Sequence, residues 1–153
     1  MSYKPFLIFL LFFSLCGCNH DNGSQSESLL DIKSNEIIKS FFSELHTRNK
    51  TAIVNLLRQN ENIDLNDSST LNLVKKFNDI NELSGKLMSE KLLRKKLLGD
   101  DLGVYIYLVK YESKFYRFVF TFYNNDVTTK VYKFSFDDTA DLEIEEGLKL
   151  YTN

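Results

Sequence analysis

The sequence predicts an α+β fold in which N-terminal helices pack on an antiparallel sheet of about four strands. Apolar residues in the first half of the chain recur at the spacing of one helical face. In the second half they alternate along the chain, which is the period of a β-strand. A block of helices followed by a block of strands is typical of domains whose helices cover one face of a sheet.

The composition limits both size and chemistry. The chain has 153 residues, of which 43% are hydrophobic and 26% charged, so one folded domain is expected. Its formal net charge is -2, which offers no broad cationic surface to a phosphate backbone. We therefore expect no nucleic-acid partner.

The segment SNEIIKSFFSELHTR predicts the first helix. Ser34 is a suitable N-cap, because its hydroxyl can accept a hydrogen bond from a free N–H group of the first turn, and Asn49 is a suitable stop. The residues expected on the buried face are Ile37, Ile38, Phe41, Phe42 and Leu45.

Two further helices are expected before the strands begin. Thr51 would cap a short second helix, and Ser69 or Thr70 would open a third after the polar loop QNENIDLNDSS. The third helix should close near Ser84 and Gly85. The buried candidates of these helices are Ile53, Val54, Leu56, Leu57, Leu73, Val74, Phe77 and Ile80.

Strands are expected over residues 86–98, 104–111, 115–123 and 127–136. The first is ambiguous, because Glu90 and Arg94 also have the i,i+4 spacing of a helical pair. We assign a strand because a helix has just ended and the later segments are all β. Two aromatic rows are expected, one from Tyr116 to Phe122 and one from Tyr132 to Phe136. Whether they lie on the same face of the sheet depends on the length of the turn at YNND, which the sequence leaves open.

Both cysteines lie in the stretch LCGC, residues 15–18, after an apolar run that begins at Phe6. That run has about ten residues, whereas a helix needs roughly 20 to cross a bilayer, so its length is typical of a signal peptide. The segment resembles the bacterial lipoprotein signal peptide, whose lipobox reads Leu, two small residues and Cys. The resemblance implies that Cys18 receives a diacylglyceryl group and that a peptidase removes residues 1–17.

Two other interpretations of these cysteines stay open. One is an uncleaved hydrophobic N-terminus, and the other is a metal site formed by Cys16 and Cys18. The metal site is disfavoured, because no second pair of His or Cys stands nearby. We expect neither a metal nor another cofactor.

The expected organisation is a lipoprotein signal peptide over residues 1–17, the lipidated Cys18 with a flexible tether over residues 18–30, and a single α+β domain over residues 31–153. The tether sequence NHDNGSQSES has nothing apolar to bury, so His20 should be solvated. In the lipoprotein family an Asp directly after the anchor favours the inner membrane, whereas this chain has Asn19. We therefore expect the outer membrane, on its periplasmic side.

A second resemblance rests on the stretches FFSELHTRNKTAIVNLL, LSGKLMSEKLL and GVYIYLVKYESKFYRFVFTFYNNDVTTKVYKFSF. Their order and hydrophobic pattern over residues 34–136 resemble the nuclear transport factor 2-like, or cystatin-like, cone fold, including small bacterial lipoproteins of that superfamily. The resemblance implies that the sheet is curved and cone-like. The chain departs from it in lacking a Trp in the final strand and in the acidic segment after Phe136. The superfamily holds enzymes such as ketosteroid isomerase and scytalone dehydratase as well as binding modules, so the fold does not choose between these functions.

In those enzymes an Asp or His inside the cone acts as base, and a Tyr or Asp polarises a carbonyl group. Here His46 is expected to be a solvated or capping residue at a helix end. Tyr105, Tyr107, Tyr116 and Tyr132 could line a cavity, but core packing is the favoured role. No residue pair forms a catalytic set, so we expect no enzyme.

Two charged segments remain. Residues 137–146 hold six carboxylates without the oxygen-ligand spacing of a calcium loop, so a solvated tail is favoured. Residues Arg94, Lys95 and Lys96 are expected to form a charged edge strand that discourages aggregation; contact with anionic lipid or with the acidic segment is the alternative.

The leading prediction is a lipid-anchored cell-envelope protein that acts as a non-enzymatic binding module for a protein or an apolar small ligand. One alternative is an immunity-type lipoprotein that neutralises a toxin in the periplasm. The other is an isomerase or dehydratase that uses the interior of the cone.

Overall fold

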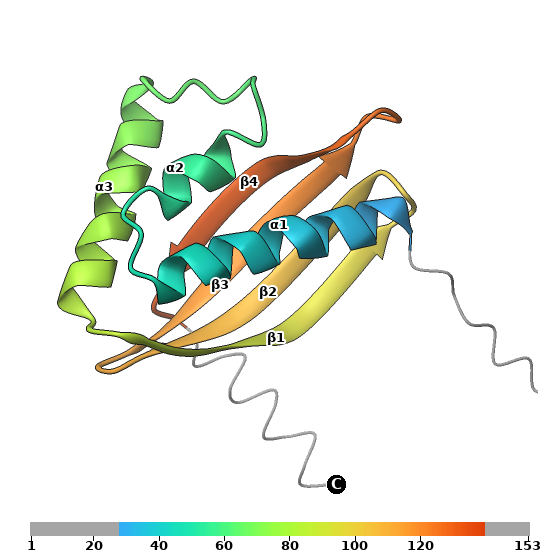
Figure 1. Ribbon diagram of the computed structural model, residues 1–153. Coiled ribbons are helices and arrows are strands. Elements are labelled where there is room, and N and C mark those ends of the chain that lie inside the picture. Colours follow the sequence, from blue (N-terminus) through green and yellow to red (C-terminus); the bar gives the residue numbers. More distant parts are fainter. Residues whose placement is uncertain (1–27, 140–153) are drawn as a thin grey trace, which may run out of the picture.

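The computed structural model describes residues 28–139, which fold as three helices followed by a four-stranded antiparallel sheet (Figure 1). The predicted fold class is therefore confirmed. The signal peptide, Cys18, His20, nearly all of the tether and most of the acidic segment lie outside the described residues. The elements are α1 (Leu29–His46), α2 (Ala52–Leu57), α3 (Ser68–Leu83), β1 (Leu87–Leu98), β2 (Leu102–Tyr111), β3 (Phe115–Asn124) and β4 (Thr129–Asp137).

Helix α1 begins earlier than predicted. Its N-cap is Ser28, whose hydroxyl accepts a hydrogen bond from the Asp31 N–H at 3.2 Å. The prediction of Ser34 as the cap is wrong, because Ser34 lies inside the helix and is fully buried. Leu30, which the sequence analysis placed in the tether, is 0% exposed, and its burial accounts for the extra helical turn.

The N-cap of α3 also lies two or three residues earlier than predicted. Its N-cap is Asp67, whose carboxylate accepts from the N–H groups of Ser69 and Thr70. Neither of the two predicted caps is used, since the carboxylate that precedes them already satisfies those donors. The helix ends at Leu83 with Ser84 as C-cap, as predicted.

The sheet has the order β1-β2-β3-β4, and all three helices lie on one side of it (Figure 1). The predicted strand over residues 86–98 is confirmed as β1. In its register Glu90 lies opposite Val109 and Arg94 opposite Ile106. Glu90 and Arg94 have the spacing of a helical pair, but the hydrogen bonds with β2 hold this segment as a strand. In this strand Lys95, and not Arg94, lies on the helix side of the sheet.

The two aromatic rows lie on the same face of the sheet. Phe120 pairs with Phe134 and Phe118 with Phe136, and the rings of Phe120 and Phe134 are 5.0 Å apart. Tyr132 leaves its row, because a bulge follows Thr121 in the pairing of β3 with β4, and it is 63% exposed. The turn spans residues 125–128, longer than the two or three residues considered from the sequence.

The space between helices and sheet is filled by aromatic side chains. Phe41 of α1 packs against Phe77 of α3 and against Phe120 of β3, with ring centroids 5.7 and 5.4 Å apart. Phe118, Phe120 and Phe122 are each 0% exposed. The interior is thus a packed core, so hollows that could hold a ligand lie at its margins.

Candidate functional site

A hollow of about 320 Å³ lies where the end of α1, the last turns of α3 and the start of β1 meet, and we call it the basal pocket. Its floor consists of buried apolar side chains, whereas its rim is polar and charged. This combination is typical of small-molecule sites. Its lining residues are Leu45, Arg48, Asn49, Lys50, Asn78, Asn81, Glu82, Gly85, Leu87 and Tyr111.

The end of α1 brings a cation to the rim. Arg48 has the left-handed φ of 56°, its N–H bonds to the Leu45 carbonyl at 2.9 Å, and the Asn49 N–H bonds to the Glu44 carbonyl at 3.0 Å. These two bonds close the helix as a Schellman motif, with Arg48 at the position that usually holds glycine. The predicted stop, Asn49, comes one residue too late. A left-handed arginine costs about 1 kcal/mol, so its presence at a pocket rim is a pointer to function.

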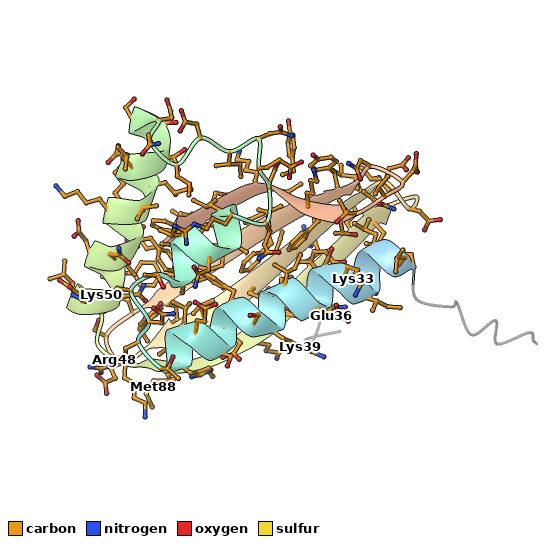
Figure 2. All side chains as sticks on the ribbon, turned by 45° about the horizontal axis from the view of Figure 1, so that its top comes forward. Lys33, Glu36, Lys39, Arg48, Lys50 and Met88 are labelled. Carbon is orange, nitrogen blue, oxygen red and sulfur yellow. The ribbon has the colours of Figure 1, made fainter. Side chains whose placement is uncertain are left out.

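The charges on the rim do not cancel. Lys50 Nζ and Glu82 Oε1 are 2.5 Å apart and form an exposed ion pair, which lowers the pKa of the Glu82 carboxyl. Arg48 has no ion-pair partner among residues 28–139. Figure 2 shows Arg48 and Lys50 at the same end of the molecule, beyond the last turn of α1. The rim therefore carries one positive charge that is available to an anion.

The floor and one wall are held in place by hydrogen bonds. The Tyr111 hydroxyl donates to Asn81 Oδ1, and Asn81 Nδ2 donates to the Phe77 carbonyl at 3.2 Å. Burial raises the pKa of Tyr111, which keeps its hydroxyl protonated as a donor. These bonds fix the orientation of the amide at the junction of α3 and β2.

The wall at Gly85 is equally constrained. Gly85 has a φ of 83°, and a Cβ there would lie 2.3 Å from Glu112 Oε2. The same Glu112 oxygen accepts from the Lys86 N–H at 3.0 Å, and the Glu112 N–H bonds to the Lys86 carbonyl at 3.0 Å. The turn that joins α3 to β1 is thereby fastened to the turn that joins β2 to β3, so the pocket is formed before any ligand arrives.

A second hollow, of about 510 Å³, lies between α1 and the first two strands, and we call it the lateral groove. His46 Nε2 and Glu90 Oε2 are 3.0 Å apart at its edge. Tyr107 lines the same groove, and burial together with the charge of Glu90 raises the pKa of its hydroxyl. The apolar residues of the groove are Ile38 and Phe42.

A buried carboxylate connects α1 to the sheet. Asp31 accepts from Lys95 Nζ at 2.7 Å, from the Tyr105 hydroxyl at 2.8 Å and from Asn35 Nδ2 at 3.2 Å. Burial alone would raise the pKa of Asp31, but the bonds from Lys95 and Tyr105 together hold it below its usual value. Asp31 lines neither the basal pocket nor the lateral groove, so its role is to hold α1 on β1 and β2.

The candidate site residues named from the sequence do not come together in one site. His46 is the last residue of α1 and is partly exposed, as expected, but its bond to Glu90 was missed. Tyr105 and Tyr116 are core residues, as expected, whereas Tyr107 borders the lateral groove and Tyr132 is exposed. Of the basic residues on β1, Lys95 pairs with Asp31.

The residues of the basal pocket were not identified from the sequence as a site. Their spacing carries no motif, because the pocket is assembled from four separate elements, α1, α3, β1 and β2. The one local signal is the helix stop followed by two basic residues, Arg48 and Lys50, on either side of Asn49.

Residues 28–139 contain no cluster of three or more His, Cys, Asp or Glu side chains that could hold a metal ion. Within the same residues, no helix has the length and apolarity needed to cross a membrane. Comparison of the chain with protein-family models, with curated proteins and with solved structures finds no match.

Proposed function

We propose that this protein is a lipid-anchored, non-enzymatic binding module of the bacterial cell envelope, and that its basal pocket holds a small amphipathic anion. The observation that carries the proposal is the basal pocket itself, in which an apolar floor of Leu45, Leu87 and Tyr111 lies beneath an arginine without an ion-pair partner in the described residues. The apolar ligand expected from the sequence is thereby narrowed to one that also carries a negative group.

Size and charge define the class of ligand. A hollow of about 320 Å³ is at the lower limit of small-molecule sites, so a short chain or a single ring fits better than a long lipid. The floor would bury the apolar body at about 25 cal/mol for each Å² removed from water. The Arg48 guanidinium would bind a carboxylate through charge-assisted hydrogen bonds. A medium-length carboxylate such as octanoate has these features.

The location is proposed from the lipobox. Acylation at Cys18 would hold the domain close to a lipid surface, and Asn19 favours the outer membrane on its periplasmic side. The methylene chain of such an acid partitions into lipid at about 0.8 kcal/mol for each buried CH₂, so a tethered module with a preformed pocket is suited to bind it near a membrane. The membrane is the expected partner through the anchor alone.

Arg48→Gln should weaken octanoate binding by about tenfold or more, because a hydrogen bond to a charged group contributes roughly 1.5 to 3 kcal/mol. The measurement is isothermal titration of octanoate into the soluble form, residues 19–153. Lys33→Gln is the matched control, since Lys33 is an exposed cation of α1 outside the pocket that pairs with Glu36.

Two outcomes would contradict this assignment. One is octanoate binding of equal strength in wild type and Arg48→Gln. The other is binding of octylamine as tight as that of octanoate, because a site that depends on Arg48 must prefer the anion. Loss of binding in Lys33→Gln would point to a general charge effect.

A second candidate function, isomerase or dehydratase, is favoured by one observation. His46, Glu90 and Tyr107 line the lateral groove together, and a base beside a tyrosine hydroxyl is the pair that enolisation needs. This candidate requires that the protein speed the conversion of cyclohex-3-en-1-one into its conjugated isomer, followed by ultraviolet absorbance, and that His46→Gln abolish the gain. An isomerisation rate equal to that in buffer alone would contradict this second candidate function.

A further inference from the structure

The face of the sheet opposite the helices has an apolar centre. Strand residues alternate between faces, and on β2 the side chains of Tyr105, Tyr107 and Val109 lie on the helix side. The residues that alternate with them point away from the helices. We call this surface the open face. Its central residues are Val104, Ile106 and Leu108 of β2 and Val119 and Thr121 of β3, all partly exposed and adjacent in the register.

Cations frame this apolar centre on both sides. Lys96 lies beside Val104 and Lys91 beside Leu108 on β1, and Lys133 lies beside Thr121 on β4. All three lysines are exposed, and none has an ion-pair partner among residues 28–139. An apolar strip with two lysines on one side and one on the other favours an occupant that combines apolar and acidic side chains.

The described chain leaves the sheet on this face. Asp137, the last residue of β4, is 2.8 Å from Arg117 Nη2, and Arg117 has the same orientation as Val119. Thr139 Oγ1 is 3.5 Å from the same guanidinium. The C-terminal segment therefore starts at the open face.

Residues 140–153 read ADLEIEEGLKLYTN. Leu142 and Ile144 alternate with acidic residues, and after Gly147 the pattern resumes with Leu148 and Leu150. The segment holds four carboxylates and one lysine. Fully extended it reaches up to about 46 Å, whereas a ten-residue strand spans about 33 Å, so it can follow the strands over their whole length.

We propose that residues 140–153 dock on the open face, with their leucine and isoleucine side chains on the strip of Val104, Ile106, Leu108 and Val119. Because the carboxylates alternate with these apolar residues, they lie on the outer side of the docked segment, where the long side chains of Lys91, Lys96 and Lys133 extend past its edges to meet them. The chain thus supplies its own cover for a surface that would otherwise expose a contiguous apolar patch to water. This inference is independent of the basal pocket, which lies on the helix side of the sheet.

Zero-length cross-linking tests the contact directly. A water-soluble carbodiimide joins amines to carboxylates that touch, and peptide mass spectrometry of the acylated full-length protein in detergent identifies the linked pairs. We expect links from Lys91, Lys96 or Lys133 to the carboxylates of residues 141–146. Lys50 and Glu82, which are 2.5 Å apart and exposed, provide the positive control.

An equal mixture of ¹⁴N and ¹⁵N protein separates the possible occupants. Links within chains of one isotope support the proposal. Mixed-isotope links would show that the segment of a second copy occupies the face and would overturn the proposal as stated. A Lys50–Glu82 link without any link from the open-face lysines would overturn it as well.

Removal of the segment provides a second measurement. In a chain that stops after Thr139, the acetylation rates of Lys91, Lys96 and Lys133 should rise severalfold, while that of the exposed Lys33 stays unchanged. Lys95, which is paired with the buried Asp31, stays protected if the shortened chain is folded. If the shortened chain is not folded, the same acetylation rates are measured in the full-length variant Glu143→Gln, Glu145→Gln, Glu146→Gln. Unchanged acetylation rates in a folded variant would contradict docking. Octanoate binding to the basal pocket should be the same in these variants as in wild type.

Discussion

Asp31→Ala should lower the free energy of unfolding by about 2 to 4 kcal/mol, because it removes one member of a buried, hydrogen-bonded pair. The Asp31 side chain is 2% exposed and binds both Lys95 and Tyr105. Lys95 is 38% exposed and can turn to solvent, whereas Tyr105 is 0% exposed and would lose its acceptor inside the protein. The measurement is urea unfolding followed by far-ultraviolet circular dichroism.

Glu36→Ala is the matched control for this change. Glu36 also lies in α1 and also pairs with a lysine, Lys33, at 2.8 Å, but that pair is 51% and 59% exposed. Exposed pairs contribute up to about 1 kcal/mol and often nothing measurable. Equal losses in Asp31→Ala and Glu36→Ala would show that the buried pair does not hold α1 on the sheet.

The dependence on pH provides a second readout for Asp31. Its pKa is lowered in the folded state by the bonds from Lys95 and Tyr105, which outweigh the opposing effect of burial. Its contribution to stability is therefore present above the unfolded pKa of about 3.9 and is lost as pH falls through the folded pKa. Asp31→Asn should lose stability less steeply than wild type below about pH 4. Parallel curves would contradict this account.

The sequence was sufficient for the order of the elements and for most of the core. Periodicity is a local property, and the row of Phe118, Phe120 and Phe122 shows it along one strand. The start of α1 was predicted too late, because Ser34 and Ser28 are equally suitable caps by residue type. The burial of Leu30 favours the helix start at Ser28 over Ser34, and that burial depends on the rest of the fold.

The sites could not be predicted in the same way, because their members are distant in sequence. Asp31 is 64 residues from Lys95 and 74 from Tyr105, and His46 is 44 from Glu90. Each of these residues alone is an ordinary polar side chain. Only the register of β1 with β2 brings Lys95 opposite Tyr105 and makes the cluster visible.

The bulge between β3 and β4 illustrates the same limit. Tyr132 belongs to a regular aromatic row by sequence, yet the irregularity after Thr121 turns it outward beside Tyr123, with ring centroids 6.1 Å apart. Strand period alone assumes an uninterrupted ladder. A bulge adds one residue and moves the next residues of the strand to the opposite face. The residue types around Tyr132 do not indicate that a bulge occurs there.

Cys18→Ala should abolish membrane anchoring of the full-length chain by its lipid, which is the largest effect we expect. The thiol of Cys18 is the proposed acceptor of the diacylglyceryl group, and alanine has no nucleophile to replace it. Because one acyl chain gives only marginal membrane binding and two or more give stable anchoring, loss of the acceptor removes the anchor entirely. Cells labelled with radioactive palmitate should show label on wild type and none on the variant, which keeps residues 1–17.

Cys16→Ala separates this proposal from the alternatives. If Cys18 alone is the anchor, Cys16→Ala is labelled and processed like wild type, because Cys16 departs with the leader and alanine is also small. A metal site formed by both cysteines would respond equally to either change, and an uncleaved N-terminus would leave Met1 attached in all three proteins. Palmitate label on Cys18→Ala would refute acylation at this residue, and with it the proposed location of the basal pocket beside a membrane.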